Sequence, residues 1–239
     1  MPERLVIIPT YNEKENIREI IAHVLGLQPA FDLLIVDDGS PDGTASLVKE
    51  MQAAHPGRVH LIERAGKLGL GTAYIAGFKW ALEHGYGFIF EMDADFSHNP
   101  DDLVRLYAAC AERGGDMSVG SRYVKGGHVK DWSWDRILLS YFASLYVRAI
   151  LWIGVRDTTA GFVCYTRRVL EALPLEHVRF IGYAFQIEMK YRVRRKGFRI
   201  VEVPITFIDR EKGTSKMNSS IFREAIIGVL QMRFGGWIN

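Results

Sequence analysis

The sequence has little cysteine and no long apolar run, and both absences narrow what the protein can be. Its 239 residues include only two cysteines, Cys110 and Cys164, which lie in apolar segments without the spacing of a metal or redox motif. We therefore expect two reduced core thiols and a reducing compartment. No stretch reaches the roughly 18 uninterrupted apolar residues of a membrane span, so a transmembrane helix is not predicted.

Signals of secretion and of nucleic-acid binding are also missing. Residues 1–4 lead directly into an apolar strand, without the charged region, long apolar region and small-residue cleavage site of a secretory signal. The formal net charge of +2 is too small to indicate a nucleic-acid partner. No internal repeat or linker is visible, so the length indicates one domain spanning residues 1–239.

Apolar strand patterns alternate with helical patterns through the first half of the chain. Several strand candidates are continuous apolar runs, which is typical of strands covered on both faces in a parallel sheet. The first helix is expected to follow Asn12 as its N-cap, with Glu15 three residues later. We therefore predict an α/β fold with a doubly wound, mostly parallel sheet. The expected strands are Leu5–Ile8, Leu33–Val36, Val59–Ile62, Phe88–Phe90 and Met117–Val119.

Acidic residues follow three of these strands. In doubly wound sheets, ligands bind beyond the carboxyl ends of the strands. Three of the four strand ends that we consider carry acid, in residues 9–13, 37–40 and 93–95, whereas residues 120–122 do not. This charge is unfavourable for direct binding of an anionic cofactor, but it suits a site in which a divalent cation lies between protein and anion.

Asp93 and Asp95 are the strongest candidates for such a cation site. Side chains two residues apart point the same way in an extended chain. Two close carboxylates raise each other's pKa unless a cation neutralises them. Mg²⁺ and Mn²⁺ take oxygen ligands, often one or two carboxylates plus substrate phosphates. An isolated Asp-x-Asp is more often a solvated turn, but its place at the end of a predicted parallel strand favours metal binding.

Two further loops have more than one interpretation. The 37–40 segment can be a turn that precedes a capped helix, or a carboxylate site for a ribose or base. The glycine-rich 67–72 segment precedes a helix, but Tyr74 stands where the dinucleotide fingerprint needs its third Gly or Ala. This departure argues against a Rossmann dehydrogenase, and no Walker A motif is present. Lys67 is either a phosphate contact or a solvated loop residue.

Taken together, these motifs resemble the inverting family-2 glycosyltransferases, which have a GT-A nucleotide-sugar-binding fold. Segments further along narrow the resemblance to the dolichol-phosphate (polyprenol-phosphate) mannose synthases. The ordered set covers nearly the whole chain, which makes it far more specific than Asp-Ala-Asp alone. The matching segments are Pro9–Glu13, Asp37–Thr44, Lys67–Tyr74, Met92–Asp95 with Ser97 and His98, Gly120–Tyr123, Asp157–Phe162, Gly182–Met189 and Arg210–Met217.

The resemblance implies roles for individual residues of one GT-A domain. Asp93, Ala94 and Asp95 would hold the metal and the diphosphate, with Asp93 and Asp95 as metal ligands. Ser97 stands where relatives carry Gln, so it is left out of the metal shell. The nucleotide-sugar pocket would be lined by Pro9, Tyr11, Glu13, Val36 and Asp38, with Lys67 as a phosphate contact. The predicted catalytic residues are Asp95, Arg122, Arg210 and Lys216.

The implied reaction moves mannose from GDP-mannose to a polyprenyl (dolichyl-type) monophosphate with inversion. Mg²⁺ or Mn²⁺ would stabilise the leaving diphosphate. A phosphomonoester with a second pKa of about 6 is already largely dianionic at neutral pH, so no general base is required. The three basic residues would position two mutually repelling phosphate groups.

Two alternatives stay open: transfer of glucose from UDP-glucose to the same lipid, and a non-catalytic sugar-nucleotide-binding module. The aspartate pair and the basic residues argue against the second. A processive polysaccharide synthase is not expected, because it would carry Gln-x-x-Arg-Trp and transmembrane helices, and the sequence shows neither. Asp157 has either a direct role or the task of orienting an arginine, and the roles of Gln186 and Glu188 stay open, with Glu188 possible as a structural residue.

Residues 135–153 and 219–238 are predicted to form membrane-interface helices. In the first, polar residues recur every four positions at Ser140, Ser144 and Arg148, and nearly everything else is apolar. The segment is too apolar for an ordinary surface helix and marginal as a span. An interfacial helix fits best, and the alternative is packing in the core or a dimer interface. We expect a peripheral protein on the cytoplasmic face of a membrane, with a separate anchor subunit as a further candidate partner.

Overall fold

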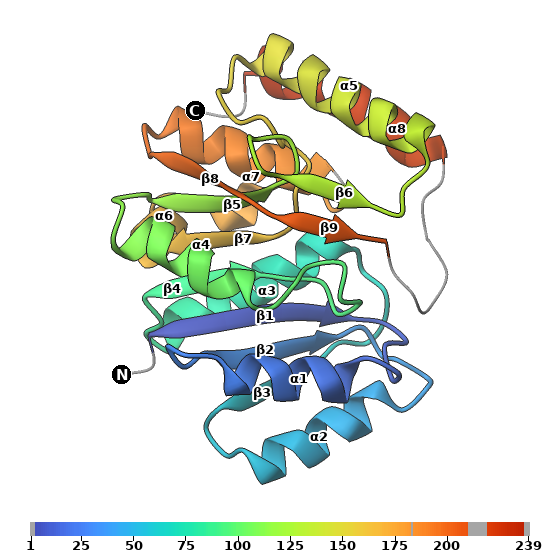
Figure 1. Ribbon diagram of the computed structural model, residues 1–239, viewed down its shortest axis with the longest axis vertical. Coiled ribbons are helices and arrows are strands. Elements are labelled where there is room, and N and C mark those ends of the chain that lie inside the picture. Colours follow the sequence, from blue (N-terminus) through green and yellow to red (C-terminus); the bar gives the residue numbers. More distant parts are fainter. Residues whose placement is uncertain (1–2, 183, 210–218, 237–239) are drawn as a thin grey trace.

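A seven-stranded sheet forms the centre of the part of the chain that the computed structural model describes, which comprises residues 3–182, 184–209 and 219–236. The strand order is β3-β2-β1-β4-β7-β5-β8. Only β7 runs antiparallel to its neighbours, β4 and β5. Helices cover both faces of the sheet (Figure 1). The predicted α/β fold with a doubly wound, mostly parallel sheet is therefore confirmed.

The elements alternate in the expected manner along the first half of the chain. The strands are β1 (Arg4–Thr10), β2 (Asp32–Asp37), β3 (Val59–Glu63), β4 (Phe88–Glu91), β5 (Met117–Ser121), β6 (His128–Lys130), β7 (Val163–Thr166), β8 (Ile200–Pro204) and β9 (Thr206–Ile208). The helices are α1 (Ile17–Gly26), α2 (Thr44–Ala54), α3 (Leu70–Glu83), α4 (Asp102–Ala111), α5 (Trp134–Leu151), α6 (Arg167–Ala172), the 3-10 helix η1 (Leu175–His177), α7 (Ala184–Arg195) and α8 (Ser219–Phe234).

The continuous apolar runs are strands buried on both faces, as the pattern predicts. Successive side chains of β1 point to opposite faces. Val6 and Ile8 join the cluster under α1, α2 and α4, whereas Leu5 and Ile7 join the cluster under α3 and α7. All four are fully buried. The sheet is therefore packed between two apolar layers.

The start of the first helix differs from the prediction. The N-cap is Asn16 and not Asn12, and the helix begins at Ile17. Asn12 has a positive φ of 60°, and its backbone N–H donates to Ser40 Oγ at 3.0 Å. The next residue, Glu13, donates its backbone N–H to Thr44 Oγ1 at 3.1 Å. Contacts with the loop after β2 thus override the local capping signal.

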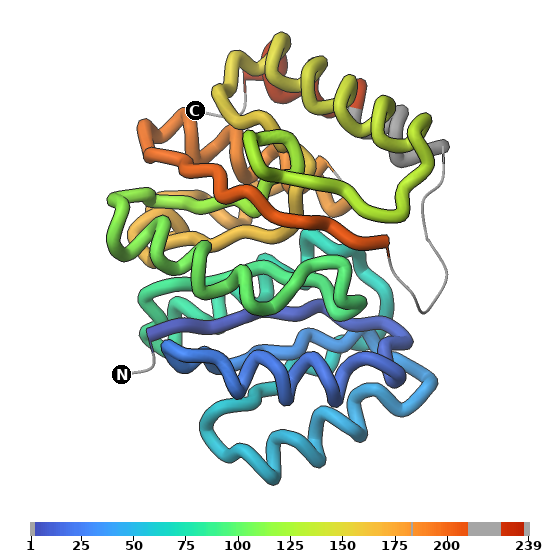
Figure 2. Tube along the Cα trace, in the orientation of Figure 1, coloured from blue at the N-terminus to red at the C-terminus, as the bar shows by residue number. Residues whose placement is uncertain are grey.

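The second half of the chain adds a small sheet and a pair of helices. Strand β6 pairs with β9 in parallel, and α5 lies beside α8 at one end of the molecule (Figures 1 and 2). Their inner faces share a separate apolar cluster with α7. Helices therefore form where residues 135–153 and 219–238 predict them. None of the helices in the described ranges has the length and apolar character needed to cross a bilayer.

Candidate active site

The loops that follow β1 and β2 lie side by side at the carboxyl edge of the sheet, to the right in Figure 1. Pro9 is the register partner of Val36. The backbone N–H of Asp38 donates to the carbonyl of Thr10 at 3.0 Å. The strand pairing therefore brings together the predicted pocket residues of the two strands, and Tyr11 and Glu13 follow directly after β1.

Asp37 and Asp38 have different tasks. Asp37 accepts hydrogen bonds from Thr10 Oγ1 at 2.9 Å and from the Ser40 backbone N–H at 2.9 Å, so it organises the turn. Asp38 accepts from Arg64 Nε at 2.6 Å, and both side chains are about nine-tenths buried, with 10% and 9% exposed. Turn chemistry thus applies to the first aspartate, and an ion pair to the second.

Arg64 was missed by the sequence analysis, although it links two predicted parts of the site. Besides Asp38, it donates to Thr72 Oγ1 at 2.7 Å and to the carbonyl of Gly69 at 3.4 Å. It therefore fastens the glycine-rich loop to the end of β2. Arg64 lies one residue after β3. The sequence analysis did not consider that strand end, and this position is the signal that would have revealed the residue. In the same loop, Lys67 Nζ lies 4.8 Å from the centroid of the Tyr11 ring.

The loop after β4 carries Asp93, Ala94 and Asp95. The chain there forms a series of bends, so the extended geometry from which the sequence analysis argued does not apply, and the convergence of the two aspartates stays a prediction. The side chain of Asp93 is 41% exposed, whereas Asp95 is 9% exposed and accepts from the Ser97 backbone N–H at 3.0 Å. Phe96 has a positive φ of 58°, which helps the chain to turn back. Asp95 is thus the fixed carboxylate, and Asp93 is the more accessible one.

His98 supports this loop from beneath. Its ring is 2% exposed, stacks on Phe162 at 4.8 Å and meets Phe207 edge-on at 5.3 Å. Burial lowers the pKa of His98 to about 4, although the charge of Asp95 opposes this shift. The neutral ring accepts the backbone N–H of Asp93 at Nδ1, at 3.4 Å. His98 therefore positions the loop and carries no positive charge at neutral pH.

The donor set of this loop fits a hard cation that is shared with a substrate. Within the described ranges, no three His, Cys, Asp or Glu residues are grouped as a complete metal site. Asp93 and Asp95 would supply carboxylate oxygens, and the remaining positions would go to water and phosphate oxygens. Mg²⁺ commonly binds in this way, with one or two carboxylates and substrate phosphates.

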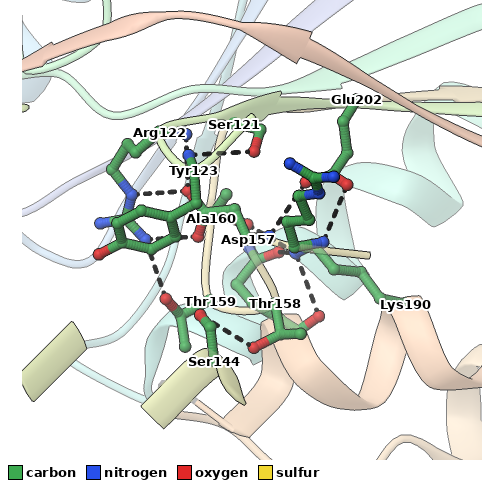
Figure 3. A network of polar contacts seen from close by, with 12 residues as sticks. Ser121, Arg122, Tyr123, Ser144, Asp157, Thr158, Thr159, Ala160, Lys190 and Glu202 are labelled. Atoms are coloured by element: carbon green, nitrogen blue, oxygen red, sulfur yellow. Dashed lines mark hydrogen bonds and ion pairs between the residues drawn. The ribbon is translucent and has the colours of Figure 1, made fainter. Parts of the chain in front are cut away.

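Arg122, at the end of β5, is held by a buried carboxylate (Figure 3). Its Nε and Nη2 donate to the two oxygens of Asp157 at 2.7 and 2.6 Å. Nη2 also donates to Thr159 Oγ1 at 2.9 Å. Burial alone would raise the pKa of Asp157, but the Arg122 charge and its hydrogen bonds hold that pKa below the ordinary value. The interpretation of Asp157 as the residue that orients an arginine therefore has direct support in this contact.

Aromatic rings complete the surroundings of Arg122. Its guanidinium carbon lies 5.2 to 5.6 Å from the ring centroids of Tyr123, Trp132 and Phe207. The other two predicted basic residues, Arg210 and Lys216, lie outside the described residues. Their approach to Arg122 therefore stays a prediction.

Two residues whose roles were open have structural tasks. Glu188 is fully buried, pairs with Arg192 at 2.8 Å and accepts the backbone N–H of Phe180 at 3.0 Å. Gln186 donates to Glu91 at 2.5 Å. From α7, Glu188 thus holds the segment that contains Phe180, and Gln186 contacts the end of β4.

A buried lysine extends this network, and the sequence analysis missed it. Lys190 is fully buried, and its Nζ donates to the carbonyl of Ala160 at 2.6 Å and to Gln186 Oε1 at 3.3 Å. Burial lowers the pKa of Lys190 to about 8 and raises the pKa of Glu91 to about 7. The four-residue spacing from Gln186 places Lys190 on the same helix face. Nothing in the sequence, however, reveals that the charge of Glu91 on β4 acts on this lysine.

The polar stripe of α5 faces the protein. Ser144 is 1% exposed, and its Oγ accepts from Thr158 Oγ1 at 3.3 Å (Figure 3). Val147 and Leu151 are buried on this inner side as well, and further apolar side chains lie on the outer side. We call this area the outer apolar surface; besides Trp134 at the start of α5, its exposed members on the two helices are Leu138, Leu139, Tyr141, Phe142, Leu145, Ile226, Ile227, Leu230 and Phe234.

Comparisons with known proteins agree with this architecture. The profile described as "Glycosyl transferase family 2" matches residues 5–173. The chain is 50% identical over 235 residues to a polyprenol monophosphomannose synthase of Mycolicibacterium smegmatis, covering 98% of this chain and 88% of that protein. It is 46% identical over 225 residues to an undecaprenyl-phosphate mannosyltransferase of Micrococcus luteus, covering 94% and 91%.

Solved structures show the same fold at low sequence identity. Glucosyl-3-phosphoglycerate synthase of Mycobacterium tuberculosis, in complex with Mn²⁺, UDP and glucosyl-3-phosphoglycerate, superimposes with a TM-score of 0.69. The identity is 19%, and the match covers 97% of this chain and 80% of that one. The fold is therefore of the GT-A type. With a family match over most of its length and two relatives near half identity, the chain belongs to glycosyltransferase family 2.

Proposed function

We propose that the protein transfers mannose from GDP-mannose to a polyprenyl monophosphate with inversion, which gives polyprenyl-phosphate mannose. The observation that carries the proposal is the 50% identity to a polyprenol monophosphomannose synthase over 98% of the chain. The undecaprenyl-phosphate mannosyltransferase supports the same acceptor class and the same sugar. GDP as the nucleotide of the donor is a finer step, which follows from the resemblance of the motifs.

The residues at the sheet edge have roles that suit this reaction. Pro9, Tyr11, Glu13, Val36 and Asp38 would line the nucleotide pocket. A divalent cation held by Asp93 and Asp95 would stabilise the charge that develops on the leaving diphosphate. Because Asp95 is fixed by the Ser97 N–H, its oxygens are positioned before substrate binds, and such preorganisation lowers the reorganisation needed during the reaction.

The acceptor needs positioning and no deprotonation. A phosphomonoester is largely dianionic at neutral pH, since its second pKa is about 6. Arg122 offers a positive charge whose direction is fixed by Asp157. Arg210 and Lys216 are proposed to contribute further positive charge. Together these groups would reduce the repulsion between the acceptor phosphate and the donor diphosphate.

The outer apolar surface is proposed to rest on a lipid membrane. Single side chains on it are as much as 57% and 77% exposed, at Phe142 and Phe234. Trp134 is the first residue of α5 and Trp152 follows its last residue; they are 74% and 79% exposed, and tryptophan favours the membrane–water interface. A polyprenyl acceptor resides in lipid, so an interfacial surface beside the active site would give direct access to it. The cytoplasmic face and a separate anchor subunit stay predictions.

Two alternatives are decided by the same experiment. The solved relative that binds UDP shares only the fold, so UDP-glucose is retained as an alternative donor. A non-catalytic binding module would bind the sugar nucleotide without transferring the sugar. A transfer assay with GDP-mannose and UDP-glucose in parallel, a short polyprenyl phosphate and Mg²⁺ or Mn²⁺ distinguishes all three. Greater thermal stabilisation by UDP than by GDP in the presence of Mn²⁺ would contradict the assignment of GDP-mannose as the donor.

The sharpest variant for this assay is Asp95→Ala. We expect it to fold and to lose mannosyl transfer by at least about 100-fold, the scale of losing one electrostatic stabiliser of a transition state. Asp101→Ala is the matched control, because Asp101 lies in the same region and pairs with His23 on the surface, where its side chain is 65% exposed. Full activity of Asp95→Ala would remove the metal argument.

A further inference from the structure

Residues 179–182 form a short segment between the helix pair α5 and α8 and the glycine-rich loop of residues 67–72. Its backbone is anchored from α7, because the N–H groups of Arg179 and Phe180 donate to the carboxylate of Glu188 at 3.0 Å each. Glu188 is itself fully buried and paired with Arg192. The backbone at the start of the segment is therefore held in place. Its side chains can transmit a displacement between α8 and the glycine-rich loop.

On one side, the segment shapes the start of α3. The carbonyl of Ile181 accepts the N–H of Gly71 at 2.8 Å. A Cβ at Gly71 would lie 2.8 Å from the carbonyl oxygen of Phe180, and a Cβ at Gly69 would lie 3.1 Å from the Ile181 side chain. A side chain at Gly71 would clash with this backbone oxygen, and a side chain at Gly69 would press on Ile181 and strain a backbone whose φ is +100°. The conformation of the glycine-rich loop is therefore set by residues 180 and 181.

That loop belongs to the proposed donor pocket. Arg64 joins Thr72 and the carbonyl of Gly69 to Asp38, and Lys67 lies over the Tyr11 ring. A shift of the loop would therefore move residues assigned to the nucleotide and its phosphates.

On its other side, the segment contacts α8. A Cβ at Gly228 would lie 2.8 Å from Cε1 and 2.9 Å from Cζ of the Phe180 ring. Phe180 packs against the cluster that Val229 and Met232 of α8 form with Val147 of α5. The ring thus meets the inner side of a helix whose outer side carries the exposed Ile226, Ile227, Leu230 and Phe234.

We propose that Phe180 is a positioning residue that couples the seating of α8 to the glycine-rich loop, and through it to binding of the nucleoside diphosphate. The inference rests on the proposed function, because it assumes that the loop contacts a donor nucleotide. Coupling between two sites is reciprocal in binding free energy. Contact of α8 with its membrane surface and occupation of the donor pocket therefore influence each other through one aromatic ring.

The experiment adds one methyl group at the contact. Gly228→Ala forces either the Phe180 ring or α8 to move, and we expect the Kd for GDP in the presence of Mn²⁺ to rise by about 2- to 30-fold, the range found for substitutions along coupled networks. In steady state, the KM for the donor should rise while kcat and the KM for the lipid acceptor change little. Titration calorimetry and a donor-dependence series provide these values.

A matched control and a suppressor make the test specific. Met232→Ala loosens the packing of α8 in the same cluster without adding atoms against Phe180, so it should leave the Kd for GDP unchanged. Phe180→Leu removes ring atoms, so it should also weaken GDP binding by itself. Combined with Gly228→Ala, however, it makes room for the added methyl group, and the double variant should bind GDP more tightly than Gly228→Ala alone.

Two outcomes would overturn the coupling while leaving the proposed function in place. The first is an unchanged Kd for GDP in Gly228→Ala. The second is an equal rise in Gly228→Ala and Met232→Ala, since this would indicate general loosening of α8. Wild-type protein that binds neither GDP nor UDP would overturn both the coupling and the proposed function.

Discussion

The central sheet and the helix pair α5 and α8 are both rich in apolar residues, but they bury them to opposite degrees. Leu5 in β1 is 0% exposed, whereas Leu139 in α5 is 49% exposed. The strand is covered by helices on both faces, whereas the described residues leave one side of α5 exposed (Figure 1). Burial is therefore decided by how many faces are covered, and residue type alone does not predict it.

The inner side of α5 sharpens this comparison. In an ordinary surface helix, the apolar stripe faces the core and polar residues face water. In α5, Ser144 is buried against Thr158, and Leu139 and Phe142 are exposed. The inner side of α5 combines this polar contact with the buried Val147 and Leu151, and its outer side is apolar as well, which is what an apolar environment on the outside would favour. The two regions thus differ in their surroundings: the sheet is covered by protein, and the outer side of α5 is proposed to face lipid.

The largest effect on stability is expected from breaking the Arg122–Asp157 ion pair, which links the end of β5 in the sheet to the segment after α5. Arg122 follows β5, Asp157 follows α5, and both side chains are buried. Asp157→Asn would leave a buried guanidinium without its counter-charge, so we expect the free energy of unfolding to fall by about 3–5 kcal/mol. Urea denaturation measures this loss. Asp209→Asn, at the more exposed pair with Arg136, is the control and should change stability by about 0–1 kcal/mol.

The same variant has a defined pH dependence. The pKa of Asp157 in the folded protein lies below its ordinary value of 3.8, so its contribution to stability is present above that value and is lost as the pH falls through the folded pKa. The stability difference between wild type and Asp157→Asn should therefore be constant at neutral pH and shrink in acid. A difference that stays constant down to the acid unfolding transition would contradict this account of the pair.

The second test makes one substitution in each region. Leu5→Ala removes a fully buried side chain from the sheet and should lower the free energy of unfolding by about 2–5 kcal/mol. Leu139→Ala changes an exposed position, and in lipid-free buffer it should alter stability by no more than about 0.5 kcal/mol. Chemical denaturation of both variants gives the comparison. Equal losses would mean that α5 is covered by protein in solution, for example by a second copy of the chain.

The sheet could be predicted from the sequence because its pattern is local. The predicted strand Leu5–Ile8 lies within β1 and Leu33–Val36 within β2, and continuous apolar runs indicate strands that are covered on both faces. Strand β7 was not predicted, although it lies inside the sheet between β4 and β5. Its four residues carry no long pattern, and its antiparallel pairing with β4 and β5 depends on contacts far away in the sequence.

The site was predictable only in part, and for a related reason. Strand ends point to Asp38, Asp95 and Arg122, because ligands gather at the carboxyl edge of such a sheet. The same rule would also have pointed to Arg64, which follows β3, had that strand end been considered. Lys190 lies within α7 and could not be identified in this way, since it is defined by a buried contact with another segment. Buried charges in folded proteins are paired or hydrogen-bonded, but the sequence does not say with what.

The third prediction tests what covers the outer apolar surface. Phe142 and Leu68 are 57% and 56% exposed, but only Phe142 lies on the helix pair. If α5 rests on lipid, Phe142→Ser should lose about 1.5–3 kcal/mol of membrane binding, which corresponds to roughly 10- to 100-fold weaker partitioning. Leu68→Ser should partition like the wild type. Flotation with vesicles of phosphatidylethanolamine and phosphatidylglycerol measures both variants, and identical partitioning would remove α5 from the membrane contact.

The smallest effect is expected where α5 and α8 meet at their carboxyl ends. The guanidinium of Arg233 lies 5.1 Å from the centroid of the Trp152 ring, and Trp152 is 79% exposed. In water such a contact contributes about 0.5–1 kcal/mol, so Arg233→Gln should lower stability by no more than this amount. The double variant with Trp152→Leu should lose nothing beyond Trp152→Leu alone, because the partner ring is already gone. If the two losses in urea denaturation were simply additive, the contact would have no energetic role, and the ends of the two helices would be held together by the inner apolar cluster alone.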